Sequence, residues 1–129
     1  MIGAIRIHSF GGPELMQWEP VELSPPGAGE ITIGQTAIGL NFIDTYHRSG
    51  LYPLTLPAVL GTEAAGVVEA IGPGVNGFKI GDAVGYTGLP PGAYAEKRNW
   101  PAERTLKLPA GISAEVAASC MLKGLTAWY

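Results

Sequence analysis

The stretch that decides the fold covers residues 60–85 and reads LGTEAAGVVEAIGPGVNGFKIGDAVG. Its part 64–71 is built from small and β-branched residues, which predicts a buried strand. Residues 72–77 predict a turn, because Pro73 fixes one φ angle and the glycines permit positive φ. A second strand is expected over 80–84, so the stretch predicts two neighbouring strands joined by a tight connection.

Three residues at the start of this stretch are unusual. Gly61 and Gly66 have no Cβ, so another backbone or a ligand can approach them closely. Glu63 brings a charge into an apolar run, where a carboxylate is costly unless it is paired or lies at a cleft. For Glu63 we favour a structural salt bridge over a catalytic role. In the structural role, Glu63 would orient Arg48 or a neighbouring backbone group.

Residues 72–77 also fit the pattern G-x-G-x-x-G, which binds dinucleotides in other proteins. That fingerprint must open a helix within a βαβ unit. Here residues 78–82 lead into another strand, and a proline inside the turn suits pyrophosphate poorly. We therefore expect a hairpin turn and not a nucleotide site.

The composition is typical of a globular domain with many turns. The chain has 129 residues, 47% of them hydrophobic, with 19 Gly and 11 Pro, which favours short strands over a helical bundle. The net charge of −3 gives no electrostatic reason to expect nucleic acid or an anionic membrane as a partner. No apolar run approaches the roughly 20 residues needed to span a bilayer, and no signal-peptide pattern is visible.

The only cysteine, Cys120, excludes an internal disulfide and indicates a reducing compartment. We expect the protein to be cytoplasmic. No base is near Cys120 in the sequence, so we expect a small buried residue and not a nucleophile.

Alternation and turn residues predict a mainly antiparallel β chain. Strands are expected over 1–8, 15–21, 30–40, 93–98 and 104–108. Residues 51–60 and 86–92, both rich in proline, are expected to be loops.

Two helices are expected. The first begins at Asn41, a good N-cap residue, and Asp44 and Arg48 are spaced as an i,i+4 pair of opposite charge. The second begins after Ser113, with Glu115 in its first turn.

We therefore divide the chain into a β domain, 1–112, and a helical segment, 113–129. Residues 125–129 run apolar to the last position, without Gly, Pro or a basic last turn to close the helix. From this we expect the segment to lead on to a domain that the chain does not contain.

Three separated motifs together resemble one family. Residues 61–63 read Gly-Thr-Glu, where zinc alcohol dehydrogenases of the medium-chain dehydrogenase/reductase superfamily have Gly-His-Glu. With Asn-Phe-Ile-Asp-Thr-Tyr at 41–46 and Lys-Gly-Leu-Thr-Ala at 123–127, the chain resembles the zinc-independent NADPH:quinone oxidoreductases, relatives of zeta-crystallin. The resemblance implies the N-terminal domain only: a mainly β (α+β) fold, a GroES-like, partly open antiparallel barrel with short helices. A Rossmann domain would follow it.

The resemblance also bears on metal binding. A catalytic zinc needs about three protein ligands with a fourth position open. At the positions where the zinc relatives have cysteine and histidine, this chain has Asn41 and Thr62, so we expect no metal. Quinone reduction needs no Lewis acid to stabilise an alkoxide, so the protein mainly orients nicotinamide and acceptor.

The resemblance implies which residues form the site. Asn41, Tyr46 and Tyr52 would lie on the acceptor side as the catalytic residues, and the cofactor contacts would be Phe42, Ile43, Asp44, Thr45, Tyr46 and Thr126. A phenol such as Tyr52 could donate to a quinone carbonyl as it gains charge. Thr62 could offer a hydroxyl.

Purely structural interpretations of the same residues remain as alternatives. Residues 41–46 could be a capped surface helix, with Phe42 and Tyr46 as ordinary core contacts. Tyr52 could be a loop aromatic packed beside a proline. For Lys123 we prefer a solvated helix position over an electrostatic role.

By resemblance the full-length protein is an NADPH-dependent quinone reductase. Its cofactor is NADPH, its acceptor is a quinone, and it is a homodimer. The isolated chain is expected to be inactive, because the phosphate-binding half is missing. The alternatives are an enone or alkenal reductase of the same superfamily, a non-enzymatic crystallin-like structural protein and a co-chaperonin-like module.

Overall fold

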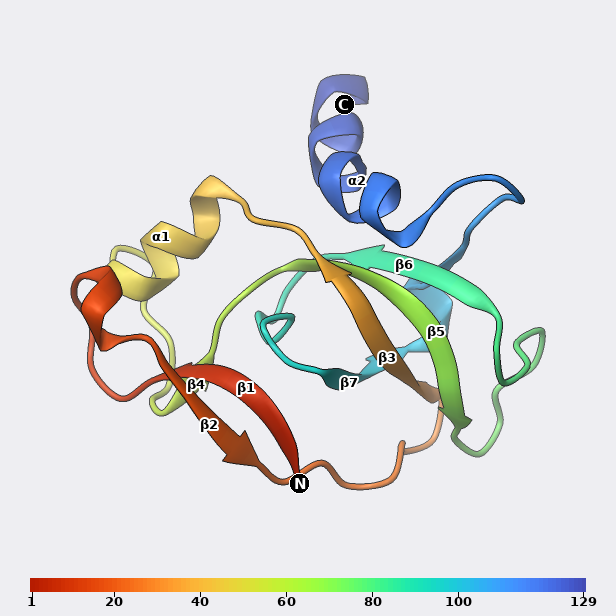
Figure 1. Cartoon of the computed structure of the whole chain (residues 1–129), viewed down its shortest axis with the longest axis horizontal. Helices are drawn as coiled ribbons and strands as arrows, with labels where there is room; N and C mark the ends of the chain where they lie inside the picture. The colour runs from red at the N-terminus through yellow and green to blue at the C-terminus, as the bar shows by residue number, and fades with distance from the viewer.

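A computed structural model describes all residues, 1–129, as two antiparallel sheets and two α-helices (Figure 1). The smaller sheet has the order β2-β1-β4 and the larger β7-β3-β5-β6-β8. The strands are β1 (Ile2–Ile7), β2 (Gln17–Val21), β3 (Glu30–Ile38), β4 (Ala58–Val59), β5 (Glu63–Ile71), β6 (Ala83–Thr87), β7 (Lys97–Pro101) and β8 (Leu106–Lys107). The predicted mainly β, partly open antiparallel fold with short helices is confirmed, and both sheets stay open at their edges.

The quoted stretch forms the centre of the larger sheet, where β5 pairs with β3 on one side and with β6 on the other. Gly66 explains the close packing, because a β-carbon there would collide with the carbonyl oxygen of Gly34 on β3. Residues 72–77 connect two strands and open no helix, which confirms the prediction of a hairpin turn.

The second strand of this stretch begins later than predicted, at Ala83 instead of residue 80. The reason is Asp82, whose carboxylate accepts hydrogen bonds from the backbone N–H of Lys79 (2.9 Å) and from its ammonium (3.0 Å). The backbone hydrogen bond is the main cause that lowers the pKa of Asp82. These contacts hold 79–82 in a turn.

Two later strands also differ from their predicted bounds. The strand expected over 93–98 lies at Lys97–Pro101, and the one expected over 104–108 is reduced to Leu106–Lys107. A short 3-10 helix, Ala102–Arg104, separates them. The loop expected over 51–60 contains the two-residue strand β4, which pairs with β1.

The main core lies on the larger sheet and is closed by aromatic rings. Tyr86 and Trp100 stack with their centroids 4.5 Å apart. The guanidinium groups of Arg98 and Arg104 lie 4.3 and 4.5 Å from the centroid of the Trp100 ring, a favourable cation–π geometry. The other buried members are Ile31, Ile33, Ala64, Val68, Val84 and Ala93.

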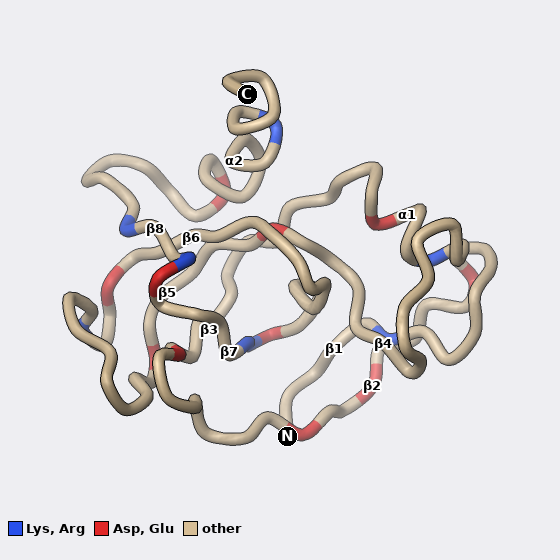
Figure 2. Tube along the Cα trace, turned by 180° about the vertical axis from the view of Figure 1, so that it is seen from behind, with Lys and Arg blue, Asp and Glu red and all other residues tan.

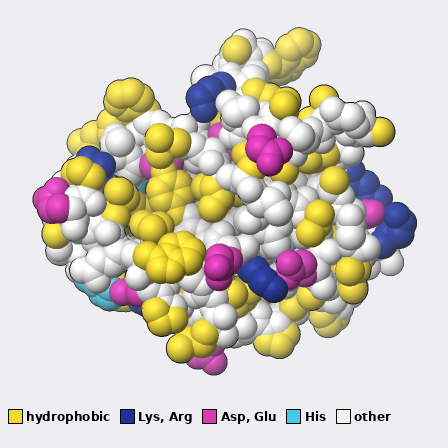
Figure 3. Space-filling model, viewed as in Figure 1, with side chains coloured by type: hydrophobic (Ala, Val, Ile, Leu, Met, Phe, Trp, Pro, Cys, Tyr) yellow, Lys and Arg dark blue, Asp and Glu magenta, His cyan; other side chains and the backbone are white.

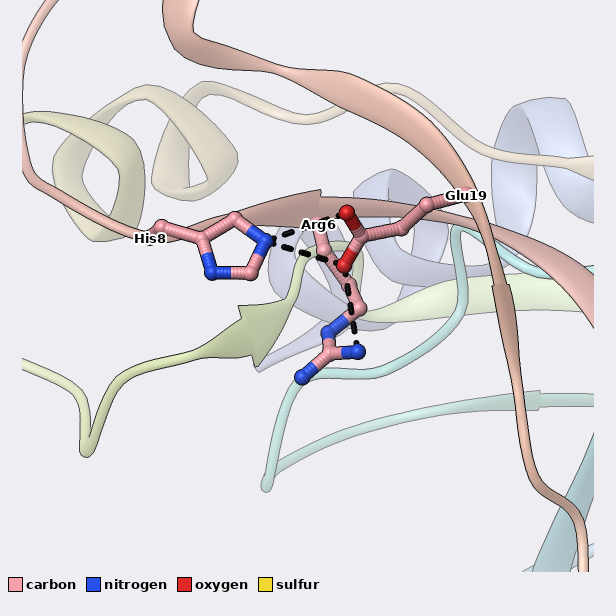
Figure 4. A network of polar contacts seen from close by, with 3 residues as sticks. All are labelled: Arg6, His8 and Glu19. Carbon is pink, nitrogen blue, oxygen red and sulfur yellow. Dashed lines mark hydrogen bonds and ion pairs between the residues drawn. The ribbon is translucent and has the colours of Figure 1, made fainter.

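The smaller sheet carries a polar cluster on its surface. Figure 4 shows the carboxylate of Glu19 between Arg6 and His8. Glu19 Oε1 is 3.1 Å from Arg6 Nη1 and 3.0 Å from His8 Nε2. Such exposed pairs contribute little to stability, and Figure 2 shows acidic and basic residues interspersed along the trace.

The second helix, α2 (Ala114–Trp128), begins where predicted, because the Ser113 hydroxyl accepts a hydrogen bond from the N–H of Val116 (3.1 Å). Its first turns bury Ala117 and Ala118 against Ala65 of β5. Its C-terminal end stands away from the sheets (Figure 1), and Trp128 is exposed. Cys120 is exposed as well, so the prediction that it is buried was wrong.

Candidate active site

The site is built around the start of α1 (Phe42–Ser49). Asn41 is the N-cap, as predicted. The Asp44 carboxylate accepts a hydrogen bond from the Asn41 backbone N–H (3.0 Å), and the Asp44 N–H donates to the Asn41 carbonyl (3.0 Å). Gly50 ends the helix in the left-handed conformation, with φ of 84°, which favours glycine.

Asp44 lies in the first turn of α1 and is buried. It also accepts a hydrogen bond from the hydroxyl of Tyr94 (2.6 Å), and burial followed by this contact raises the pKa of Tyr94. The predicted pair with Arg48 is not formed, because the Arg48 Nε donates instead to the Gly11 carbonyl (3.1 Å). The structure therefore places Asp44 where it orients α1.

A cleft of about 540 Å³ lies between the start of α1 and the end of α2. It brings together two motifs that lie about 80 residues apart in the sequence, and it is mostly apolar. Four predicted site residues line it: Asn41, Phe42, Ile43 and Thr126. The other lining residues are Leu40, Leu122, Lys123 and Ala127.

The exposure of Phe42 distinguishes the two interpretations of residues 41–46, a wall of the cofactor site or a capped helix with Phe42 in the core. Phe42 is 80% exposed, so the reading of Phe42 as a core contact was wrong. A large apolar side chain on the wall of a cleft is instead available to a ligand. The Thr126 hydroxyl donates to the Leu122 carbonyl (2.8 Å), which leaves its oxygen free to accept a hydrogen bond.

Tyr46 lies one helical turn beyond Phe42, and Tyr52, which follows the end of α1, packs against it. Their rings meet edge to face at 5.3 Å, and the Tyr52 backbone N–H donates to the Tyr46 carbonyl (3.2 Å). Tyr52 is half-exposed. The Thr45 hydroxyl donates back to the Phe42 carbonyl (2.6 Å). Thr45 and Tyr46 belong to α1 and Tyr52 to the loop after it, and none of the three lines the cleft itself.

Behind the cleft lies Glu63, which is fully buried. One carboxylate oxygen accepts a hydrogen bond from the Asn41 side-chain amide (2.8 Å), and the other accepts from the Leu122 backbone N–H (2.7 Å). The predicted salt bridge is absent, so that expectation was wrong. The expectation that Glu63 orients a neighbouring backbone group was correct.

The sequence did not predict the burial of two further polar groups, the His47 ring and the Thr62 hydroxyl. His47 is buried on α1 and its Nδ1 has no partner. Burial lowers its pKa, and the nearby Asp44 charge opposes this. The Thr62 hydroxyl is buried without a partner too. Only the helical spacing of His47 from Asp44 could have signalled that both face inward.

Lys123 differs in part from the expectation of a solvated position. The residue is exposed, yet its ammonium donates to Asn41 Oδ1 (3.2 Å) and to the Leu40 carbonyl (3.4 Å). No pattern in the sequence pairs Lys123 with Asn41, because they lie on different elements.

No three His, Cys, Asp or Glu side chains lie together as a possible metal site. Neither helix is long and apolar enough to cross a bilayer.

The family model described as the alcohol dehydrogenase GroES-like domain matches residues 27–110. A quinone oxidoreductase of Pseudomonas aeruginosa is 48% identical over the whole chain. A 2-haloacrylate reductase of Burkholderia is 47% identical, also over the whole chain. The chain spans 40% of the length of each.

Among solved structures, the quinone oxidoreductase of Escherichia coli in complex with NADPH superposes with a TM-score of 0.95. It is 48% identical, and the match covers 98% of this chain and 39% of that protein.

Proposed function

Because the chain belongs to the alcohol dehydrogenase GroES-like domain family, we propose that it is the acceptor-side domain of an NADPH-dependent quinone oxidoreductase that works without zinc. The observation that carries this is the cleft between α1 and α2, which is lined by residues of both motifs. High identity to quinone oxidoreductases supports the choice of acceptor.

The cleft suits the nicotinamide end of the cofactor. Its wall is apolar around Phe42 and Ile43, as a flat ring requires, and it carries a few polar groups that fix orientation. Thr126 has an oxygen free to accept from a carboxamide N–H. When bound, the cofactor supplies a hydride, and the residues of this chain hold the ring and the acceptor in contact.

This chain does not suit the phosphates of the cofactor. Its one G-x-G-x-x-G sequence, residues 72–77, is a hairpin turn between β5 and β6, whereas phosphates bind at the start of a helix. We therefore assign residues 1–112 to the acceptor-side domain and 113–129 to the connection to a nucleotide-binding domain. The resemblance also supports a homodimeric, cytoplasmic protein.

On the acceptor side, we assign Asn41, Tyr46 and Tyr52 to the reacting quinone. Asn41 has the geometry to donate from its amide at the cleft. The Tyr46 ring lies next to Phe42 of the cleft wall, with the ring centroids 6.2 Å apart, and it contacts the ring of Tyr52. We assign Phe42, Ile43, Thr45 and Thr126 to the nicotinamide, and Asp44 to the same segment as the group that orients it.

The test is NADPH oxidation with tetramethyl-1,4-benzoquinone as the acceptor. Its ring carbons are all substituted, so it cannot add to the exposed Cys120 thiol. We expect turnover, resistant to a chelator, from the intact reading frame that encodes the chain, and little from the 129 residues alone. Reduction of enones but not of this quinone would assign the other reductase class, and no reduction of any acceptor would contradict the proposal.

A further inference from the structure

A buried negative charge joins three elements behind the cleft. Both oxygens of Glu63 are occupied by N–H donors, one from the α1 N-cap residue Asn41 and one from Leu122 of α2. Gly39, at the end of β3, leaves the space for it, because a β-carbon there would collide with the Glu63 carboxylate. No cation contacts Glu63 directly.

The hydrogen bonds continue from Glu63 to a positive charge. An ionised carboxylate can only accept hydrogen bonds, so the NH2 group of Asn41 must face Glu63. The amide oxygen then faces the other way and accepts from the Lys123 ammonium (3.2 Å). One amide therefore links a buried anion to a cation at the cleft, and its direction is set by the anion.

We propose that Lys123 is the cationic group of the acceptor site and that Glu63 is a positioning residue, which holds Lys123 there through Asn41. This rests on the proposed function. An ammonium has three N–H donors, of which Lys123 gives two to Asn41 and Leu40. Asn41 gives one of its two amide N–H groups to Glu63. One donor remains on each residue at the lining of a mostly apolar cleft.

Two donors, one of them charged, recognise an oxygen that gains negative charge. A hydride brings one hydrogen and two electrons to the quinone. The hydrogen forms an O–H bond at one oxygen, and the other oxygen becomes a phenolate. The Lys123 ammonium stabilises that charge more strongly in the cleft than it would in water. An N–H bond of Lys123 then breaks as the second O–H bond of the hydroquinone forms, and the amine recovers a proton from solvent.

The first experiment reads the hydrogen bonds without turnover, by 1H–15N spectra of the 129-residue chain. In the variant Glu63→Gln, the single amide oxygen can serve only one of the two N–H donors. We expect the Leu122 amide and the Asn41 side-chain amide both to shift and to exchange faster with water. The matched control is Glu69→Gln, on the same strand and paired with Lys97 at the surface, which should move neither signal.

If the Leu122 and Asn41 signals of Glu63→Gln coincide with those of the parent chain, Glu63 positions nothing and the proposal is wrong. The spectra do not depend on quinone reduction. They therefore distinguish a failure of this inference from a failure of the proposed function.

The second experiment uses the intact protein with tetramethyl-1,4-benzoquinone. Lys123→Gln should lower kcat by roughly 100-fold and leave KM within about twofold, because the charge appears only in the transition state. Lys123→Arg keeps the positive charge but cannot release a proton, so it should recover only the part of the loss that comes from the charge. Lys107→Gln, which removes an exposed lysine paired with Asp82, should retain the parent kcat.

The double variant Glu63→Gln/Lys123→Gln decides how Glu63 acts. If Glu63 works only through Lys123, the double variant should be no slower than Lys123→Gln alone. Multiplied losses would show an independent role for Glu63, and an unchanged kcat in Lys123→Gln would remove Lys123 from the site. Either result would overturn the proposal.

Discussion

Tyr86 and Trp100 stack in the core of the larger sheet, where both are withdrawn from water, whereas Phe42 on the wall of the cleft is 80% exposed. In the core, the apolar and aromatic side chains pack against one another and need no partner from outside the chain. The cleft has apolar surface without a partner and a buried charge held by hydrogen bonds. The difference indicates that the sheet supplies stability, whereas the junction of the helices has apolar surface that is available to a ligand.

Figure 3 shows a similar contrast on one face of the molecule. Hydrophobic side chains gather on the side that carries α1, β1 and β2, while the remainder is mixed. A second apolar hollow has a volume of about 330 Å³, and Trp18, Ile38 and Leu40 are among the residues that line it. Leu40 also lines the cleft between the helices, so exposed apolar surface continues from one hollow to the other.

The largest expected effect is in the core. Trp100→Ala should lower the free energy of unfolding by about 3–5 kcal/mol, because it removes a buried ring and leaves a cavity. Urea denaturation measures the change. Trp18→Ala is the control, since Trp18 is 61% exposed, and it should cost less than about 0.5 kcal/mol. Equal losses would contradict the division between core and surface.

A backbone contact gives the next effect. Gly66→Ala should cost about 1–3 kcal/mol, because the new methyl group meets the Gly34 carbonyl and the strands must separate. Gly124→Ala is the matched substitution on α2, where nothing hinders a β-carbon. It should stabilise the chain by about 0.5–1 kcal/mol through helix propensity. Thermal unfolding of both variants tests whether β3 and β5 pack as described.

A smaller effect concerns His47 and pH. Burial lowers the pKa of folded His47 below its ordinary value of 6.5, so below that pH the unfolded chain binds a proton that the folded chain refuses. The contribution of His47 to stability is therefore complete above about pH 6.5 and falls as the pH decreases towards the folded pKa. His47→Phe should lose stability less steeply than the parent between these limits, measured by urea denaturation at several pH values. A profile identical to that of the parent would contradict the burial of the imidazole.

The smallest effect on stability is expected in the cleft. Phe42→Ala should change the free energy of unfolding by less than about 0.5 kcal/mol, since the ring is largely in water. The same variant should lose ligand contacts in the cleft. A loss of stability comparable to that of Trp100→Ala would show that the cleft wall belongs to the core, and the comparison between the two regions would fail.

The sequence predicted the elements that depend on local rules. The turn at 72–77, the N-cap at Asn41 and the cap at Ser113 follow from residue types that act on their own backbone. Prediction failed where a side chain took a partner that its residue type does not specify. Asp82 accepts from Lys79, three residues before it, which delays the start of β6. Arg48 donates to the distant Gly11 carbonyl and not to Asp44.

The candidate site shows the same limit. The family motifs identified Asn41, Phe42, Ile43 and Thr126, which the fold brings to one cleft. The partners of Glu63 were missed, because its donors come from α1 and from α2, far apart in the chain. The burial of His47 depends on the packing of α1 as a whole, and a short helix gives too few positions to define its inner face.

The central claim is that the cleft between α1 and α2 receives the nicotinamide end of the cofactor. The most direct measurement is a titration of the 15N-labelled 129-residue chain with reduced nicotinamide mononucleotide, which carries that end alone. The account predicts chemical-shift changes at residues 40–43 and 122–127, which are lost in Phe42→Ala. Changes centred on the hairpin 72–77, or none in the cleft at saturation, would contradict it.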